Sequence, residues 1–145
     1  MFLKIKLLKY YKMFEKFIFS DGQVEKYYKS ASRDFKIANQ AEETEVNFRF
    51  CYDALLKLAI AVCAKNNLRI KSRQGHHIKL IDKLAEIFRN DDIKIIGQEM
   101  RSKRNWDLYG GGILISKKEA AEHLKWTADI FRQGDDYLHK HKRLL

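Results

Sequence analysis

The most telling absence in this sequence is proline, which occurs nowhere among its 145 residues. Because proline interrupts helices, a chain without it is free to form long ones. Glycine is also sparse, and three of the seven glycines stand together at 110–112. No uncharged apolar run is long enough to cross a bilayer, so we expect no stable membrane span. With apolar residues recurring at helical spacing, these absences predict an all-α, up-and-down bundle of about five or six helices.

Cysteine is scarce as well, since the chain has only Cys51 and Cys63. Both fall on one expected helix, about 120° apart around its axis, and therefore cannot pair with each other within it. Two free thiols in a helical core are typical of a reducing compartment, so we expect a cytoplasmic location. No group of cysteines and histidines has the spacing of zinc ligands, and the sequence predicts neither a metal nor a cofactor.

Acidic residues are outnumbered, with 19 aspartates and glutamates against 29 lysines and arginines, for a formal net charge of +10. Such a surplus favours a polyanionic partner, with nucleic acid first and an anionic membrane surface second. A chain of this length most simply buries one core and forms one domain.

We divide the chain into three segments by their charge and periodicity. Residues 1–19 hold a basic amphipathic N-terminal helix, expected over 3–18, which is too short and too charged for a signal peptide or a membrane span. Residues 20–139 form the helical bundle, and residues 140–145 form a basic tail. The first segment leaves open a role at a membrane surface.

Capping patterns place the other helices. Ser20 with Gln23 and Ser116 with Glu119 have the spacing of capping boxes, and Asn39 to Glu42 repeats the pattern. We expect helices over about 22–38 and 41–65, a fourth after Gly75-His76-His77, a fifth capped by Asn90-Asp91-Asp92, and a last one from Ser116 to about 139. The helix over 41–65 is apolar on two sides, which predicts that it lies at the centre of the bundle. The last helix should bury Ala121, Leu124, Ala128 and Phe131.

The end of the fifth helix departs from a plain apolar pattern. Arg104 lies about 20° from Ile93 and about 40° from Met100 around the helix, so a permanent charge falls on the stripe that faces the core. Burying a guanidinium is costly unless it is paired or hydrogen-bonded. Two interpretations fit: Arg104 reaches outward to pair with Asp107, or it forms with Asn105 a pocket for phosphate, whose oxygens match the planar guanidinium.

Three motifs occur in an order that resembles one bacterial branch of the HEPN domains (higher eukaryotes and prokaryotes nucleotide-binding). They are Tyr52-Asp53-Ala54-Leu55, Gly75-His76-His77, and Arg101-Ser102-Lys103-Arg104-Asn105 followed by Tyr109. The similarity covers roughly residues 23–138. It implies a HEPN-like helical bundle that forms a homodimer, with motif residues of two protomers meeting in a cleft that binds or cleaves RNA. Many members of the family are ribonuclease toxins of toxin–antitoxin systems or partners of minimal nucleotidyltransferases.

The resemblance also implies roles for single residues. Arg104 would hold the scissile phosphate and Asn105 would orient it, with the 2′-hydroxyl of the RNA as nucleophile and no metal. The family signature ends in a histidine, whereas this chain has Tyr109 at that place. A tyrosine with a pKa near 10 is a poorer general base at neutral pH than a histidine near 6.5. Tyr109 is then a hydrogen-bond donor, or the residue that a partner nucleotidyltransferase modifies.

Further contacts to RNA or a nucleotide are expected from basic residues near the motifs: Arg73, His76, His77, Arg101 and Lys103. The adjacent histidines point about 100° apart, which makes them a poor metal pair. One interpretation has one of them capping the connector and the other exposed. In the alternative, His76 or His77 reaches the Arg104 pocket and supplies the missing base.

The angle between two motif residues bears on oligomeric state. In a regular helix Arg104 and Tyr109 point about 140° apart, so either the helix breaks or two chains each supply part of the site. A two-fold axis beside the fifth helix would bring equivalent residues together, which predicts a homodimer. Three hypotheses remain: a HEPN-type RNA-binding protein that acts as a ribonuclease toxin, a non-catalytic partner of a minimal nucleotidyltransferase or antitoxin, and a membrane-surface or structural helical protein.

Overall fold

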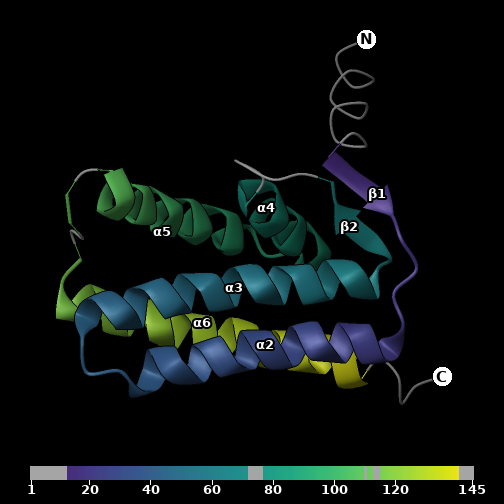
Figure 1. Ribbon diagram of the computed structural model, residues 1–145, viewed down its shortest axis with the longest axis horizontal. Helices are drawn as coiled ribbons and strands as arrows, with labels where there is room; N and C mark the ends of the chain where they lie inside the picture. The colour runs from purple at the N-terminus through teal and green to yellow at the C-terminus, as the bar shows by residue number, and fades with distance from the viewer. Residues whose placement is uncertain (1–12, 72–76, 110, 113–114, 141–145) are drawn as a thin grey trace, which may run out of the picture.

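The computed structural model describes residues 13–71, 77–109, 111–112 and 115–140 (Figure 1). In this part of the chain there are five α-helices and two short strands. They are β1 (Phe14–Lys16), α2 (Asp21–Gln40), α3 (Thr44–Lys65), β2 (Leu68–Ile70), α4 (His77–Phe88), α5 (Asp91–Tyr109) and α6 (Lys117–His139). The predicted all-α class is confirmed. No helix among the described residues has both the length and the apolarity that a bilayer crossing requires.

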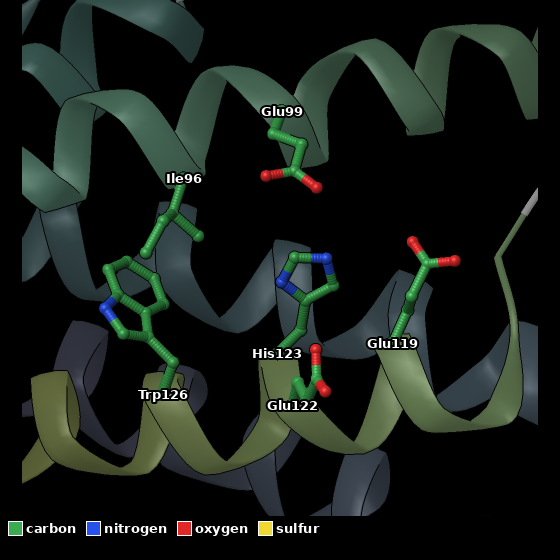
Figure 2. A pocket seen from close by; sticks show the side chains of 6 residues that line it. All are labelled: Ile96, Glu99, Glu119, Glu122, His123 and Trp126. Carbon is green, nitrogen blue, oxygen red and sulfur yellow. The ribbon is translucent and has the colours of Figure 1, made fainter.

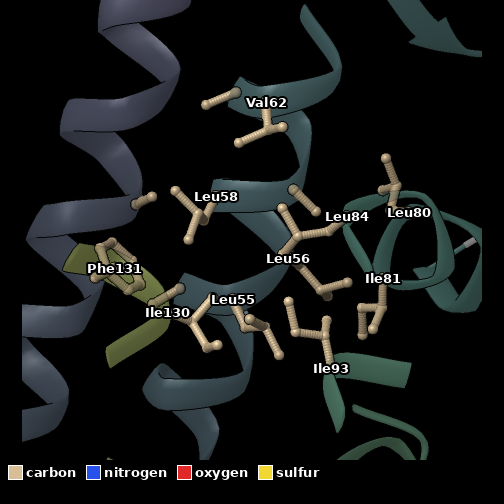
Figure 3. Packing of buried hydrophobic residues seen from close by; sticks show 14 of the residues in the cluster. Leu55, Leu56, Leu58, Val62, Leu80, Ile81, Leu84, Ile93, Ile130 and Phe131 are labelled. Carbon is tan, nitrogen blue, oxygen red and sulfur yellow. The ribbon is translucent and has the colours of Figure 1, made fainter. Parts of the chain in front are cut away.

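Helix α3 lies at the centre, as its two apolar sides predict. It packs against α2, α4, α5 and α6, and in Figure 1 it runs between α4 and α5 on one side and α2 and α6 on the other. Figure 3 shows its leucines meeting Ile81 and Leu84 of α4 in one direction and Ile130 and Phe131 of α6 in another. Apolar area buried on several faces of one helix therefore stabilises the whole bundle.

The N-terminal helix predicted over residues 3–18 is wrong for its last part. Residues Phe14–Lys16 form β1, which pairs antiparallel with β2 so that Phe14 lies opposite Ile70. Phe14 is buried, and Arg69 on β2 forms an ion pair with Glu15. A strand of three residues leaves no periodic signal, and its partner lies far along the chain. Residues 1–12 lie outside the described part.

The two serine caps are confirmed. The backbone N–H of Gln23 donates to Ser20 Oγ (3.2 Å), and the Ser20 N–H donates back to Gln23 Oε1 (2.8 Å). Ser116 Oγ accepts from the backbone N–H of Glu119 (3.1 Å). These bonds satisfy N–H groups that the first turn of a helix leaves without partners.

The predicted start of the third helix at residue 41 is wrong. Helix α3 begins at Thr44, and its N-cap residue Glu43 makes no side-chain capping bond. Asn39 instead donates to the Phe35 carbonyl of its own helix (2.8 Å). The turn is closed by Asn47, whose side-chain amide donates to two carbonyls at the end of α2. Asn47, in the first turn of α3, therefore satisfies carbonyls at the end of α2 and does not cap its own helix.

The buried face of α6 is rotated from the predicted one. Of the four residues expected inside, Phe131 is buried, whereas Ala121 is exposed and Leu124 and Ala128 are half-buried. The buried positions are Ala120, His123, Thr127, Ile130, Phe131, Gly134 and Leu138. Two polar residues take core positions because they have local uses: the Cys51 thiol donates to Thr127 Oγ1 (3.2 Å), and His123 borders a pocket.

The contact between α4 and α5 positions the functional residues. Asn90 caps α5, since its Oδ1 accepts from the Asp92 N–H (3.1 Å). The two helices approach closely at Gly97, where an added Cβ would lie 2.4 Å from Ile81 Cγ2. This tight packing fixes the start of α4 beside the second half of α5.

Candidate phosphate-binding site

Residues from three helices surround one guanidinium on the inner side of α5. Arg104 lies with its guanidinium carbon 5.6 Å from the ring centroid of Tyr52 on α3. Its charge also acts on Asp53 of α3 and on His77 at the start of α4, and Arg101 acts on Tyr52 and His77. We call these five residues, Tyr52, Asp53, His77, Arg101 and Arg104, the Arg104 cluster.

The position of Arg104 follows from the periodicity of α5. Ile93 and Met100 are fully buried, and the next residue along that face is Arg104, which is half-buried. The prediction that this charge lies on the core-facing stripe is therefore confirmed. A cation over an aromatic face gains roughly 0.5–2 kcal/mol, more as the pair is desolvated. The contact with Tyr52 partly offsets the cost of burying Arg104.

The hydroxyl of Tyr52 is the most unusual polar group in the cluster. Tyr52 is fully buried, and its hydroxyl oxygen has no hydrogen-bond partner among the described residues. Burial raises the pKa of Tyr52 to about 12, although the charges of Arg104 and Arg101 oppose the rise. The phenol is therefore protonated at neutral pH and is a donor. Because the hydroxyl is shielded, Arg104 meets Tyr52 through its aromatic ring.

Asp53 sets the charge balance of the cluster. It is half-buried, and burial raises its pKa, while the nearby positive charge of Arg104 lowers it. Asp53 thus attracts Arg104 without cancelling the cationic surplus, since Arg101 adds a second positive charge. Two guanidiniums against one carboxylate leave the cluster with a net positive charge.

His77 brings an imidazole to this cationic cluster. It is the first residue of α4 and is exposed as a residue, yet partial burial of its ring lowers its pKa, and Arg104 lowers it further. Asp53 acts in the opposite direction. The imidazole is therefore neutral at pH 7 and able to accept a proton.

The other predicted site residues do not join the cluster. Lys103 lies on the opposite flank of α5, where it donates to Glu99 (3.2 Å) and to Glu119. Asn105 is half-buried and lies about 100° around the helix from Arg104. Tyr109 is the last residue of α5, and its side chain lies outside the described residues, as do Asp107's side chain and the whole of Arg73 and His76.

Of the residues proposed to act in catalysis or RNA binding, the structure brings together Arg101, Arg104 and His77. It adds Tyr52 and Asp53, which the sequence places on the central helix but does not mark as site residues. The available signal was the motif Tyr52-Asp53-Ala54-Leu55, which the resemblance singles out without giving its residues a role. Among the described residues, no group of histidine, cysteine and carboxylate side chains is arranged to hold a metal ion.

The fold and the cluster define an all-α helical bundle with a group of cationic side chains where α3, α4 and α5 meet. Comparison with family models, with curated proteins and with solved structures finds no match for this chain.

Proposed function

We propose that the Arg104 cluster binds an RNA phosphate and that the protein is a metal-independent endoribonuclease of the HEPN type. The observation that carries this proposal is the pairing of Arg104 with Tyr52, whose buried hydroxyl has no partner in the described protein. The ring of Tyr52 holds the guanidinium on the inner side of α5, and the guanidinium offers an anion charge-assisted hydrogen bonds. The net charge of +10 adds attraction for a polyanion at longer range.

The proposed reaction is transfer of the phosphate to the 2′-hydroxyl of the same RNA chain. Neutral His77 accepts the 2′-hydroxyl proton, and the freed oxygen attacks phosphorus. The bond to the 5′-oxygen breaks, and that oxygen takes a proton from solvent. Arg104 donates to the non-bridging oxygens, where negative charge grows in the transition state, and the buried ring of Tyr52 holds its guanidinium in place. The products are a 2′,3′-cyclic phosphate and a free 5′-hydroxyl.

This assignment gives His77 the role that the family signature reserves for a histidine after the arginine. The support is electrostatic: Arg104 and His77 influence each other although they come from different helices. All five members of the cluster come from one chain. A homodimer remains a proposal that places two such clusters in one assembly, and it is not needed to complete either of them.

The test is an RNase assay with the wild-type protein and Arg104→Ala. Removing a donor aimed at a developing oxyanion costs about 100- to 1,000-fold in rate, so we expect a loss of that size. Arg132→Ala is the matched control, because Arg132 is a largely exposed arginine on α6, and it should cleave RNA at the wild-type rate. Intact RNA with the wild-type protein overturns the nuclease assignment, and equal loss in both variants overturns the role of Arg104.

A further inference from the structure

A second candidate site lies on the other flank of α5, away from the Arg104 cluster. A pocket of about 240 Å³ opens between α5 and α6 (Figure 2). It is lined by Ile96, Glu99, Glu119, Glu122, His123 and Trp126. The proposed RNA site uses none of these side chains.

His123 forms the floor of this pocket. It is only 8% exposed, and its imidazole rises from α6 toward α5 between Trp126 and Glu119 (Figure 2). The ring lies 6.0 Å from that of Phe48 behind it. Neither ring nitrogen forms a hydrogen bond with a residue that the structure describes. Burial lowers the pKa of His123, so the ring is neutral at pH 7 and offers one nitrogen lone pair as an acceptor.

The charge around His123 is negative in a protein that is otherwise strongly basic. Three carboxylates line the pocket, and one cation, Lys103, lies at its edge between Glu99 (3.2 Å) and Glu119. Three carboxylates and one ammonium group give the pocket and its edge a net charge of −2. Glu122 is exposed and makes no ion pair with any described residue. Lys103 shows that an ammonium group is accommodated beside these carboxylates. The remaining negative charge favours the binding of a second cation.

The rest of the pocket lining is apolar, which favours a cation that carries a hydrocarbon chain. Trp126 and Ile96 close one end of the pocket (Figure 2). An indole face attracts an ammonium and also covers an alkyl chain. The described side chains form no group able to hold a metal ion, so an organic cation fits better than an inorganic one.

We propose that this pocket binds the alkylammonium group of a small organic amine. The ammonium lies between Glu122 and the free ring nitrogen of His123, and the alkyl chain lies against Trp126 and Ile96. Each feature of the pocket then has a use: a carboxylate supplies charge, an imidazole accepts an N–H, and an apolar wall covers the chain. A lysine side chain of a polypeptide carries the same chemical group as a free amine, and the test separates these two sources.

The test is a fluorescence titration of the full chain carrying Trp106→Phe, so that Trp126 is the remaining tryptophan. The probe is n-butylammonium chloride at low salt, and 1-butanol is its uncharged counterpart. We expect a saturable change with the amine and none with the alcohol. Glu122→Gln should weaken amine binding roughly fivefold, as expected for one partly exposed charge pair. Glu86→Gln, which removes an exposed carboxylate from α4, should leave it unchanged.

Nα-acetyl-lysine amide, which keeps its charged ε-ammonium, is titrated in the same way and identifies the source of the alkylammonium group. Tighter binding than n-butylammonium supports the pocket and assigns it to a polypeptide lysine, whereas weaker binding supports it and assigns it to a free amine. Two results overturn the proposal: no saturable change with either amine in the millimolar range, or equal weakening by Glu122→Gln and Glu86→Gln. In the second case the amine responds only to the overall charge of the protein.

Discussion

At the scale of single residues, the functional argument depends on where one charge lies. The sequence predicts that Arg104 faces the core, because helical periodicity places it in line with Ile93 and Met100. It does not predict what Arg104 meets there. Tyr52 and Asp53 lie on α3, about fifty residues before Arg104 in the sequence. Only tertiary packing brings them close to Arg104. Periodicity assigns a side chain to a face, but it carries no information on the neighbour opposite.

Tyr52→Phe separates stability from function at this residue. The variant keeps the ring and removes a buried hydroxyl that has no partner in the described protein. Because an unsatisfied buried polar group costs about 1–3 kcal/mol, we expect the free energy of unfolding in urea to stay equal or rise. RNA cleavage should stay near the wild-type rate, because the buried hydroxyl does not reach the RNA and the ring that Arg104 contacts is kept.

The matched control is Tyr28→Phe, since the Tyr28 hydroxyl donates to Asp135 Oδ1 (3.3 Å). This variant should lose about 0.5–1.5 kcal/mol of stability and keep its activity. Marked destabilisation by Tyr52→Phe contradicts the account, because it means that the hydroxyl is already engaged within the protein.

The titration of His77 reports directly on the Arg104 cluster. Burial and Arg104 both lower the pKa of His77, and Asp53 raises it. In Arg104→Gln the pKa should therefore move up toward its ordinary value, and in Asp53→Asn it should move further down. An NMR titration of the histidine ring protons measures both shifts. An unchanged His77 pKa in Arg104→Gln means that the two side chains do not share a site.

At the scale of elements, α5 carries different functional side chains on its different sides. Its inner face carries Arg104, one flank joins α4 near His77, and the other flank joins α6 through Lys103. The sequence predicts the helix and the caps at Ser20 and Ser116, because these signals are local. It misplaces the start of α3 and the inner face of α6, where bonds between helices form: Asn47 of α3 donates to the end of α2, and Cys51 of α3 donates to Thr127 of α6.

Gly97→Ala should disturb both the packing of α4 on α5 and the Arg104 cluster. The new Cβ would lie 2.4 Å from Ile81 Cγ2, and overpacking of this kind costs about 1–3 kcal/mol in the free energy of unfolding. RNA cleavage should fall as well, because α4 carries His77. Urea denaturation and the RNase assay measure the two effects.

Gly22→Ala is the control for helix propensity. A Cβ at Gly22, in the first turn of α2, meets nothing closer than Ser20 Oγ at 3.9 Å. Alanine favours the helix over glycine by about 1 kcal/mol in a helix interior, so this variant should be as stable as the wild type or more so. If Gly97→Ala is as stable in urea as Gly22→Ala, α4 and α5 do not pack closely at Gly97.

At the scale of the whole molecule, ion pairs join α2 to the rest of the bundle. Lys57 on α3 donates to the buried Asp34 on α2 (2.7 Å), and His139 at the end of α6 lies between Glu25 and Asp135, 2.7 Å from each. The sequence predicts the helical class and the central helix, since both depend on composition and periodicity. It cannot predict the pairing of β1 with β2 or these ion pairs, which join segments distant in sequence.

His139 makes the stability of the bundle depend on pH. Hydrogen bonds to Glu25, and then to Asp135, raise its pKa above the ordinary value. Its contribution is therefore fully present below about pH 6.5 and is lost as pH rises through the raised pKa of the folded state. His139→Gln should lower the free energy of unfolding by about 0.5–1 kcal/mol near pH 6, allowing for partial exposure, and by less near pH 9. An equal loss at both values contradicts this role.

The central claim is that Arg104 forms a phosphate site and is not simply one of many positive charges. The most direct test is the affinity of a short single-stranded RNA, measured by fluorescence anisotropy at one fixed salt concentration for the wild-type protein, Arg104→Ala and Arg132→Ala. We predict that Arg104→Ala weakens binding about tenfold or more and that Arg132→Ala changes it less than about twofold, since a charge-assisted hydrogen bond is stronger than long-range attraction. Equal losses in the two variants would contradict the claim, because RNA would then respond only to net charge.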